Sequence, residues 1–599
     1  MKRATLSILA IVLVALFAAV IPTTAAAQIS VTAANPNNAP QGTVNLNVII
    51  NGNGFKKGAL AKFFVSGTPD TGGVTVTATA FNNNGQLTAT ITVADTAVVA
   101  GFDIQVMNAD GRTGKGTDMF AVTTNGNKTV APTCPVLTPL VTAPASCMTG
   151  QPGCLDTTFG ADPSYPGMVF TDTDGVLQDP NGHNYDMDGG RTVTEMADGR
   201  IVAIGATTKT LPTSPLTYQN GFAAVRYNSD GSLDATFGNG GVAKYFFSAG
   251  SAQPQDGLLQ PDGKVVGVGY IGGTYANHGA VVRFNVDGSV DTTFGSNGTF
   301  ILTEHGKNKT SDWNVYFEGV VLDSNNNLLL GAYTSGGCQA IRLTPAGALD
   351  SSFGSGGIAT LPGSFSCGEG NSIPVAIQST PAGNYILIGG SINGTFGVAR
   401  LNWNGTLNSS FGSNGNGTVT TSWCGSGNDS VHALAVDGNG NIFAAGRAQW
   451  GASTSTINFG VAKYTANGTL DSTFGYVAPG ATQPSGKAAF DIAGGSDGLR
   501  SVLVQTDGRI LLSGDPAVSG FAVTPYTVVR LNPDGSLDQT FGSGNGNAGV
   551  VMTVPQGAIG GYAFRMSLDS AGRILQTGPI KFDTGPYASW NFAIIRYIP

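Results

Sequence analysis

A phenylalanine followed by glycine recurs along this 599-residue chain from residue 159 onward. The spacing between successive copies is 57 to 78 residues, and the copies begin at Phe159, Phe237, Phe294, Phe353, Phe411, Phe474 and Phe541. A repeat of this length is typical of architectures that assemble many copies of one supersecondary unit. A further 58 residues follow Phe541, so the sequence predicts seven periods.

Each period contains two turn signals between apolar runs. The first is seen at Asp198-Gly199 and Asp262-Gly263, and the second precedes Ser-Leu-Asp, as at Asp230-Gly231. Such pairs indicate β-hairpins, because glycine accepts the positive φ of tight turns. We therefore expect four antiparallel strands per period, A to D, with strand D carrying Leu-Asp-x-Thr-Phe-Gly. Seven such units predict an all-β fold, a seven-bladed β-propeller.

The clearest copy runs from Arg226 to Gly238 and reads Arg-Tyr-Asn-Ser-Asp-Gly-Ser-Leu-Asp-Ala-Thr-Phe-Gly. It resembles the repeat of the delta-60 repeat family of bacterial exported proteins. The resemblance covers residues 154–599, with Asn408 in place of the motif Asp in one copy and Lys463 in place of the motif Arg in another. It implies a propeller, and it brings no established activity and no catalytic residues.

The copies are out of phase with the ends of the repeat region. Residues 155–160 have the strand D motif with no strands A to C before it, whereas the chain ends at strand C, residues 592–597. We expect the early strand D to join strands A to C of the last blade, which would close the ring and leave no open sheet edge.

A basic residue of strand C precedes the acidic residue of strand D by eight positions in each copy. We expect ion pairs across the C–D hairpins, each contributing about 0 to 1 kcal/mol where exposed. We expect the repeated phenylalanine to pack between blades. The expected pairs are Arg226–Asp234, Arg283–Asp291, Arg342–Asp350, Arg400–Asn408, Lys463–Asp471, Arg530–Asp538 and, across the closure, Arg596–Asp156.

The residues before the repeats predict export and a separate domain. Lys2 and Arg3, the apolar run 4–20 and the alanines 25–27 are typical of a cleaved secretory signal peptide, residues 1–27. We expect a secreted, periplasmic or cell-surface protein with no membrane span after cleavage. A membrane anchor is the alternative.

Residues 28–123 contain about seven short period-two strands, which predict a β-sandwich. The pattern Asn-Gly-Asn-Gly-Phe at 51–55, followed later by Asn-Ala-Asp-Gly-Arg at 108–112, resembles the IPT/TIG group of immunoglobulin-like domains. Residues 124–153 are rich in Thr and Pro and predict a linker before the propeller, residues 154–599.

Composition excludes some classes of partner. The net charge of −8 and the charged fraction of 11% argue against a nucleic-acid-binding protein built on a basic surface. Six cysteines in an exported chain favour disulfides, whose pairing stays open. Three of them cluster at Cys134, Cys147 and Cys154, so a long-range bridge or a free thiol is expected; the others are Cys338, Cys367 and Cys424.

One position per period departs from the repeat, at the start of strand A. The residues there are Arg191, Gln255, Glu318, Ile373, His432, Arg500 and Phe564. Four tryptophans fall in loops expected on the same face: Trp313, Trp423, Trp450 and Trp590. Variable polar side chains and exposed aromatic rings around a channel mouth predict a binding face. The alternatives are that the polar positions are merely solvated and that the tryptophans pin their own loops.

Two acidic turns in the segment 160–190 are weak candidates for a calcium site. Carboxylate oxygens are the ligands that Ca²⁺ prefers, and ordinary turn chemistry is the alternative. The four residues are Asp172, Asp174, Asp186 and Asp188. No other cofactor is predicted, and no catalytic motif occurs in a suitable context.

The sequence favours a secreted, non-enzymatic protein that presents a propeller face to a glycan or an envelope protein. The second hypothesis is a propeller enzyme acting on extracellular glycans, with Glu318, His432 and the arginines as its acid and base candidates. The third is a structural component of the surface or matrix, which predicts no focused pocket.

Overall fold

The computed structural model describes residues 28–94, 97–123, 137, 139–141, 147, 150–173, 188–211, 217–272, 276–305, 312–334, 336–367, 373–412, 415–423, 428–450, 457–475, 485–518, 523–543, 547–582 and 589–599. The chain divides into two compact units, residues 1–130 and 131–599. Within the described ranges the regular structure is β-strand, with no α-helix, and no helix there is long and apolar enough to span a bilayer. The predicted signal peptide, Cys134 and Cys424 lie outside the described residues.

The first unit consists of two four-stranded sheets around one hydrophobic cluster. One sheet has the order β1 (Ser30–Asn35), β3 (Leu46–Asn53), β6 (Gln86–Val93) and β5 (Val74–Asn83); the other has β2 (Asn38–Pro40), β8 (Thr113–Thr123), β7 (Gly101–Met107) and β4 (Leu60–Val65). Strand β6 alternates apolar and polar residues, and every second side chain is buried from Leu87 to Val93. This period-two pattern places one face of each sheet in the shared core.

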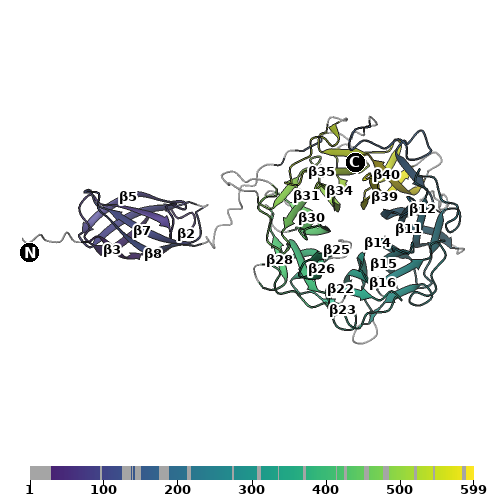
Figure 1. The fold of residues 1–599 in the computed structure, drawn as a ribbon, viewed down its shortest axis with the longest axis horizontal. Coiled ribbons are helices and arrows are strands. Elements are labelled where there is room, and N and C mark those ends of the chain that lie inside the picture. Colours follow the sequence, from purple (N-terminus) through teal and green to yellow (C-terminus); the bar gives the residue numbers. More distant parts are fainter. Residues whose placement is uncertain are drawn as a thin grey trace, which may run out of the picture. The chain divides into compact units, whose positions relative to one another are not determined.

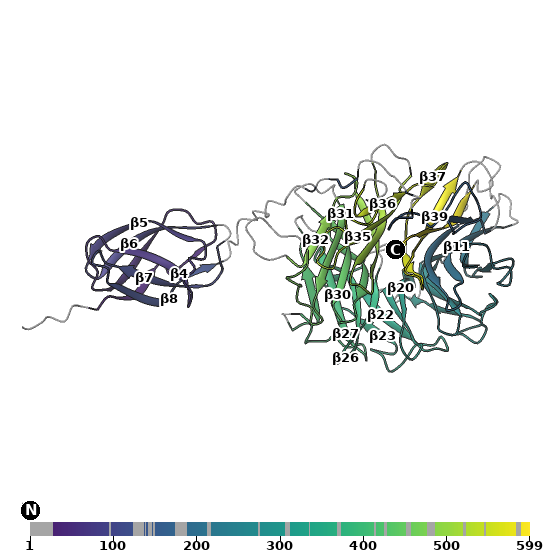
Figure 2. The same cartoon turned by 45° about the horizontal axis from the view of Figure 1, so that its top comes forward.

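The described residues of the second unit form seven sheets of four or five strands, which Figures 1 and 2 show arranged around a ring. The first three sheets are β10 (Gly189–Glu195), β11 (Ile201–Leu211), β12 (Thr217–Tyr227), β13 (Val242–Tyr245); β14 (Ala252–Leu259), β15 (Val265–Gly272), β16 (Asn277–Phe284), β17 (Thr299–Leu302); and β20 (Tyr316–Leu322), β21 (Leu328–Thr334), β22 (Gly337–Leu343), β23 (Ile358–Thr360). The next three are β24 (Phe365–Ser366), β25 (Val375–Thr380), β26 (Gly383–Ile392), β27 (Thr395–Asn402), β28 (Thr418–Thr421); β29 (Ser430–Val436), β30 (Ile442–Gln449), β31 (Ile457–Tyr464), β32 (Lys487–Phe490); and β33 (Asp497–Val504), β34 (Ile510–Pro516), β35 (Tyr526–Leu531), β36 (Val550–Thr553). The last consists of β37 (Ala558–Gly561), β38 (Met566–Leu568), β39 (Ile574–Phe582), β40 (Trp590–Tyr597) and, from the start of the unit, β9 (Met168–Thr171). A separate two-stranded sheet pairs β18 (Glu304–His305) with β19 (Asp312–Trp313).

The hydrophobic core of this unit lies between neighbouring sheets. Val202 and Ile204 of β11 belong to one cluster with Val265 of β15 and Val282 of β16. Because the middle strands are covered on both faces, residues 201–208 of β11 are all buried, and they are apolar or small except for two threonines. Such continuous burial needs a run of β-branched and small residues rather than strict alternation.

The motif Leu-Asp-x-Thr-Phe-Gly is a turn, so its assignment to strand D was wrong. Leu233 makes one isolated bridge to Tyr227, and the fourth strand, β13, begins only at Val242. Asp234 Oδ1 accepts hydrogen bonds from Thr236 N and Oγ1, at 3.0 and 2.6 Å, and Phe237 N donates to Asp234 O at 3.0 Å. These local bonds curl the backbone where a strand was expected.

The two ends of the repeat region meet. Strand β9 pairs with β40, and Asp156 N donates to Arg596 O at 2.9 Å. The strand that completes the last sheet is therefore residues 168–171 rather than 155–160, whose Leu155 contributes an isolated bridge to Tyr597.

Five of the repeated arginines, Arg226, Arg283, Arg342, Arg400 and Arg596, contact two neighbouring sheets. Arg342 Nε donates to Asp350 at 2.7 Å within its own hairpin, and Arg342 Nη1 donates to Trp403 O of the next sheet's turn at 2.8 Å. Its guanidinium also lies over the Phe353 ring, 4.7 Å from the centroid. The other in-sheet distances are 2.8 Å for Arg226–Asp234, 2.8 Å for Arg283–Asp291, 2.9 Å for Lys463–Asp471, 2.7 Å for Arg530–Asp538, 2.8 Å for Arg596–Asp156 and 3.1 Å for Arg400–Asn408.

The glycine of each Phe-Gly pair also links neighbouring sheets. Gly238 N donates to Asp287 O of the next sheet at 2.7 Å, and its φ is +54°. A Cβ there would lie 2.2 Å from Val242 O, so no other residue fits without a shift of the backbone. The same backbone bond recurs at Gly160, Gly295, Gly354, Gly412, Gly475 and Gly542.

Two disulfides occur among the described residues, Cys147–Cys154 and Cys338–Cys367. The first joins Cys147 of the predicted linker to Cys154 at the start of the predicted propeller, and Leu155 N also donates to Cys147 O at 2.8 Å. Val141 of the same segment is buried in a core cluster of the second unit. Part of the predicted linker therefore packs on the repeat region.

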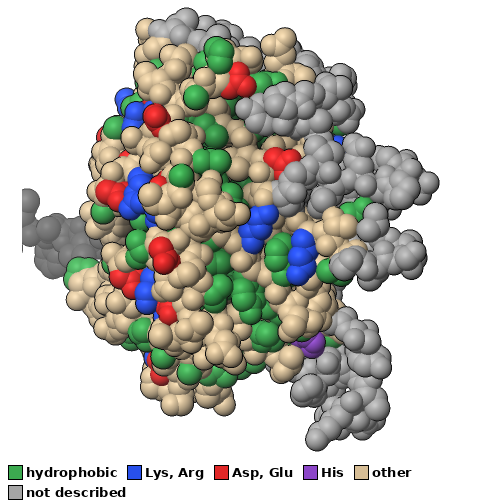
Figure 3. All heavy atoms as spheres, turned by 90° about the vertical axis from the view of Figure 1, so that its right-hand side faces the viewer, with side chains coloured by type: hydrophobic (Ala, Val, Ile, Leu, Met, Phe, Trp, Pro, Cys, Tyr) green, Lys and Arg blue, Asp and Glu red, His purple; other side chains and the backbone are tan. Residues whose placement is uncertain are grey.

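The surface reflects the low content of charged residues. On the face that Figure 3 shows, basic and acidic side chains lie close to one another among neutral ones. Exposed pairs include Arg200–Asp198 at 2.6 Å and Arg509–Asp507 at 3.1 Å.

We expect Arg596→Met to destabilise the second unit by about 3 to 5 kcal/mol, because it leaves Asp156 with its main partner removed in a buried site. All five tryptophans lie in this unit, so the midpoint of urea unfolding followed by tryptophan fluorescence measures the change. Arg509→Met is the matched control: its nearer partner Asp507 is exposed, and the buried Asp538, which it meets at 3.4 Å, keeps Arg530 at 2.7 Å, so the substitution should cost about 0 to 1 kcal/mol. Equal effects of both substitutions would contradict the role of the closing pair.

We also expect stability to decrease in acid. The hydrogen bond donated by Thr236 is the largest cause that holds the pKa of Asp234 below its usual range, and Ser352 does the same for the pKa of Asp350. A carboxyl whose pKa is lower in the folded chain contributes stability that is present above about pH 4 and is lost as the pH falls below it. The urea midpoint should drop between about pH 5 and pH 2.5, and Asp234→Asn should flatten that drop. A midpoint that stays constant over this range would show that the pairs contribute little.

Candidate functional site

The first strand of five sheets contains a β-bulge at the position that departs from the repeat. The unpaired residue in each is Arg191, Gln255, Glu318, His432 or Arg500. A bulge places an extra residue in one strand and re-aims its side chain. In the β24–β28 sheet the predicted residue, Ile373, is buried in a core cluster, and the carbonyl of the next residue, Pro374, accepts a hydrogen bond from Gly389 N at 2.9 Å.

Five of the seven predicted channel-mouth side chains line one cavity of about 350 Å³: Arg191, Gln255, Glu318, Arg500 and Phe564. They come from five different sheets. Gln253, Tyr270, Tyr562 and Arg565 complete the wall. The volume falls in the range of about 300 to 1,000 Å³ that is common for small-ligand sites.

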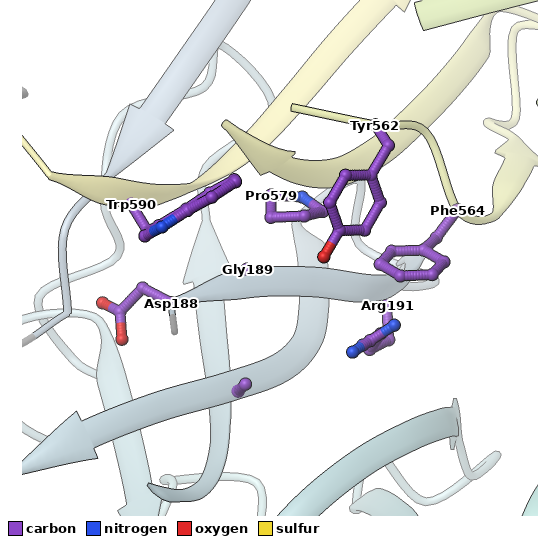
Figure 4. A pocket seen from close by; sticks show the side chains of 8 residues that line it. Asp188, Gly189, Arg191, Tyr562, Phe564, Pro579 and Trp590 are labelled. Atoms are coloured by element: carbon purple, nitrogen blue, oxygen red, sulfur yellow. The ribbon is translucent and has the colours of Figure 1, made fainter. Parts of the chain in front are cut away.

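A smaller cavity, of about 70 Å³, shares Arg191, Tyr562 and Phe564 with the first and adds Asp188 and Trp590. Figure 4 shows the Phe564 ring over the Arg191 guanidinium, with Tyr562 beside them and Trp590 further along the wall. The guanidinium carbon lies 3.9 Å from the Phe564 centroid. The rings of Tyr562 and Phe564 are 5.1 Å apart, and those of Tyr562 and Trp590 are 6.3 Å apart, both in edge-on arrangements.

Three arginines face the larger cavity in different electrostatic surroundings. Arg500 pairs with Asp515 at 3.1 Å, and Arg565 pairs with Asp256 at 3.1 Å. Arg191 forms no ion pair with any carboxylate of the described residues. Burial lowers the pKa of Arg191 to about 10, and the charge of Arg500 acts in the same direction, so Arg191 is still a cation at neutral pH.

A third cavity, of about 290 Å³, contains His432 together with Arg447, Asp497, Arg500 and Asp515. Burial, with the charges of Arg500 and Arg447, lowers the pKa of His432 to about 3. Burial raises the pKa of Asp497 to about 8, and its Oδ2 accepts a hydrogen bond from Ile492 N at 2.8 Å. Asp429 also sits three residues before a bulge and accepts from Gln449 N at 2.7 Å, so both carboxyls tie down local backbone.

The predicted rim of exposed tryptophans was wrong for two of its members. Trp423 and Trp450 are 5% and 8% exposed, and both belong to a core cluster. Trp423 lies 5.1 Å from Phe396 and 6.2 Å from Trp450, measured between ring centroids. Gly460 leaves the space that Trp423 fills, because a Cβ there would be 3.0 Å from the indole. Trp313 lies in β19, and its side chain is outside the described residues.

The predicted calcium ligands are only partly within the described residues. Asp174 and Asp186 lie outside them. Asp172 accepts a hydrogen bond from Ser589 Oγ at 3.1 Å, and Asp188 accepts one from Thr173 N at 2.7 Å. No group of three or more candidate metal ligands occurs in the part of the chain that the structure describes.

Sequence reasoning missed Tyr270, Arg447 and Asp515. Each directly follows the glycine of the second strand in its sheet, as in Gly269-Tyr270. This position varies from period to period, so alignment of the repeats on that glycine would have found it.

Comparison with protein-family models supports the repeat. Five segments match the family described as "Domain of unknown function (DUF5122) beta-propeller": residues 197–237, 260–294, 384–411, 438–474 and 505–541. Four of these segments run from the first turn of a period to its phenylalanine, and the third segment begins at the start of strand β26. The matches are consistent with a repeat propeller family. No curated protein matches the chain with significant similarity.

Solved structures show distant likeness. Drosophila Plexin A in complex with Semaphorin 1b is 10% identical, with 57% of this chain and 78% of that chain covered and a TM-score of 0.28. PorZ, a surface component of the type-IX secretion system of Porphyromonas gingivalis, is 10% identical, with coverages of 96% and 74% and a TM-score of 0.21. Prolyl oligopeptidase B from Galerina marginata is 10% identical, with coverages of 71% and 56% and a TM-score of 0.26. At these scores the likenesses carry no functional argument.

We expect Trp423→Ala to act on stability. Removing an indole that is buried against Phe396 should cost about 3 to 5 kcal/mol, because a cavity remains. Thermal unfolding followed by circular dichroism measures the loss, and Ile559→Ala, at a site 40% exposed, is the control, expected within about 0.5 kcal/mol of the unchanged chain. Unchanged stability of Trp423→Ala would restore the rim interpretation.

Proposed function

We propose that this chain is an exported, non-enzymatic binding protein whose second unit is a closed seven-bladed propeller and whose first unit is an immunoglobulin-like domain of the IPT/TIG group. The ligand, a glycan or an envelope protein, would enter at the channel mouth. Export is supported by the apolar N-terminal segment and by two disulfides, which persist in oxidising compartments.

The observation that carries the binding function is the convergence of non-repeated side chains. Arg191, Gln255, Glu318, Arg500 and Phe564 come from five sheets and line one cavity, whereas the repeated side chains are used between sheets. A purely structural component has no need of such a cavity. Polar groups that converge on a concave site of this size favour ligand binding.

The enzyme alternative has one observation in its favour, the histidine and two carboxyls in the third cavity. A histidine whose pKa is about 3 is a weak base at neutral pH, since catalytic pKa values lie near the working pH. Asp497 is engaged by Ile492 N, and Asp515 is paired with Arg500. These groups hold the walls of the mouth in place, so binding is the better supported function.

A steric block tests the proposal. Gln255→Trp would fill the cavity from a bulged position, and we expect it to weaken binding at least tenfold without lowering the melting temperature. Binding is measured on a surface that carries a glycan panel or purified envelope proteins, with and without calcium. Ser324→Trp is the control. Ser324 is exposed in the turn that follows β20, whereas the bulge of that strand, whose Glu318 lines the cavity, lies near its start.

Two results would contradict the proposal. One is that the unchanged chain binds no member of either panel. The other is that Gln255→Trp binds as tightly as the unchanged chain.

A further inference from the structure

The larger cavity holds a cation that no described protein carboxylate neutralises. Arg191 is half-buried on the bulge of β10, and its guanidinium contacts the face of Phe564. The other two arginines of the wall are paired with Asp515 and Asp256. A charge that is shielded from water without a partner is unfavourable unless an anion reaches it.

Arg191 faces both cavities of the mouth, so a ligand in either can reach its donors. The guanidinium carbon of Arg500 lies 5.8 Å from the centroid of the same ring. The planar fork of a guanidinium matches the two oxygens of a carboxylate, which it can bind through two parallel hydrogen bonds. Phosphate groups fit the same fork, and a carboxylate is the anion of this kind that carries a single charge.

The rest of the wall suits a sugar ring. Tyr562, Phe564 and Trp590 offer flat apolar faces to the C–H groups of a pyranose. Gln255 and Glu318 supply oxygens that can accept hydrogen bonds from hydroxyl groups. Glu318 and the chain's net charge of −8 also disfavour ligands with a dense negative charge, such as nucleic acids.

We propose that the channel mouth binds a carboxylate-bearing sugar, with Arg191 as the group that holds the carboxylate and the tyrosine, phenylalanine and tryptophan as the stacking wall. This inference rests on the proposed binding function and names its ligand class. A neutral sugar of the same shape would leave Arg191 unpaired, so the carboxylate determines the specificity.

Matched oligosaccharides test the charge requirement on the full chain. The acidic probes are tetramers of galacturonic, glucuronic and mannuronic acid and sialyllactose; the neutral probes are the carboxyl-reduced tetramers and lactose. We expect at least one acidic probe to bind at least tenfold more tightly than its neutral partner by calorimetry. Its affinity should fall as the salt concentration rises, because the contact is between opposite charges.

Substitution of Arg191 tests whether this residue causes the preference for the acidic probe. Arg191→Gln should lower the affinity for the acidic probe at least tenfold and leave affinity for the neutral partner unchanged. Arg191→Lys, which keeps the charge and loses the fork, should lie between the two. Arg509→Gln, at an exposed site on the turn side of β34, should bind like the unchanged chain. Melting temperatures show whether each variant is folded.

The outcomes separate this inference from the function on which it rests. Equal binding of acidic and neutral probes would overturn the carboxylate requirement and leave a sugar-binding mouth. Binding of an envelope protein with no binding of any sugar would overturn the ligand class and leave the binding function. An acidic probe bound as well by folded Arg191→Gln would overturn the role of Arg191.

Discussion

The second unit depends on one interaction that recurs around it: an arginine that pairs within its own hairpin and donates to a carbonyl of the next sheet. In Arg342 the Nε atom is bound by Asp350, the guanidinium lies on Phe353, and Nη1 donates to Trp403 O of the following sheet. A sheet with four strands cannot cover its own faces, so its stability depends on its neighbours. The arginine fixes how neighbouring sheets meet, and Arg596 makes the same contacts with Asp156 and Ser229 O where the chain ends meet.

The proposed binding function rests on the places where this repetition stops. A bulge near the start of the first strand inserts one extra residue, and the strand pairing continues on both sides of it. The inserted residue can therefore differ from sheet to sheet without disturbing the pairing. The ring brings these residues together, although Arg191 and Arg500 are 309 positions apart in sequence. Sheets with a repeated structure can therefore surround one cavity whose lining residues are not repeated. In the proposed function, the charge of Arg191 selects what the cavity accepts.

The β-structure and the repeat could be predicted from the sequence, because both depend on patterns that extend over only a few residues. Asp-Gly turns, apolar runs and the eight-residue spacing of basic and acidic residues are all short-range patterns. The predicted exposure of Trp423 and Trp450 was wrong. Trp423 was expected on an exposed rim, but whether an aromatic ring in a loop is exposed depends on space in the neighbouring strand, here the space that Gly460 leaves.

From the sequence alone come the period, the turn positions, the partners of the ion pairs and the positions that break the repeat. These depend on φ preferences, side-chain periodicity and spacing within one hairpin, all of which act over a few residues. The tertiary structure decided which of the variable residues share a cavity, that the Phe-Gly motif is a turn, and that residues 168–171 complete the last sheet. Those outcomes depend on packing between segments that are far apart in the chain, and no local pattern encodes the distance between them.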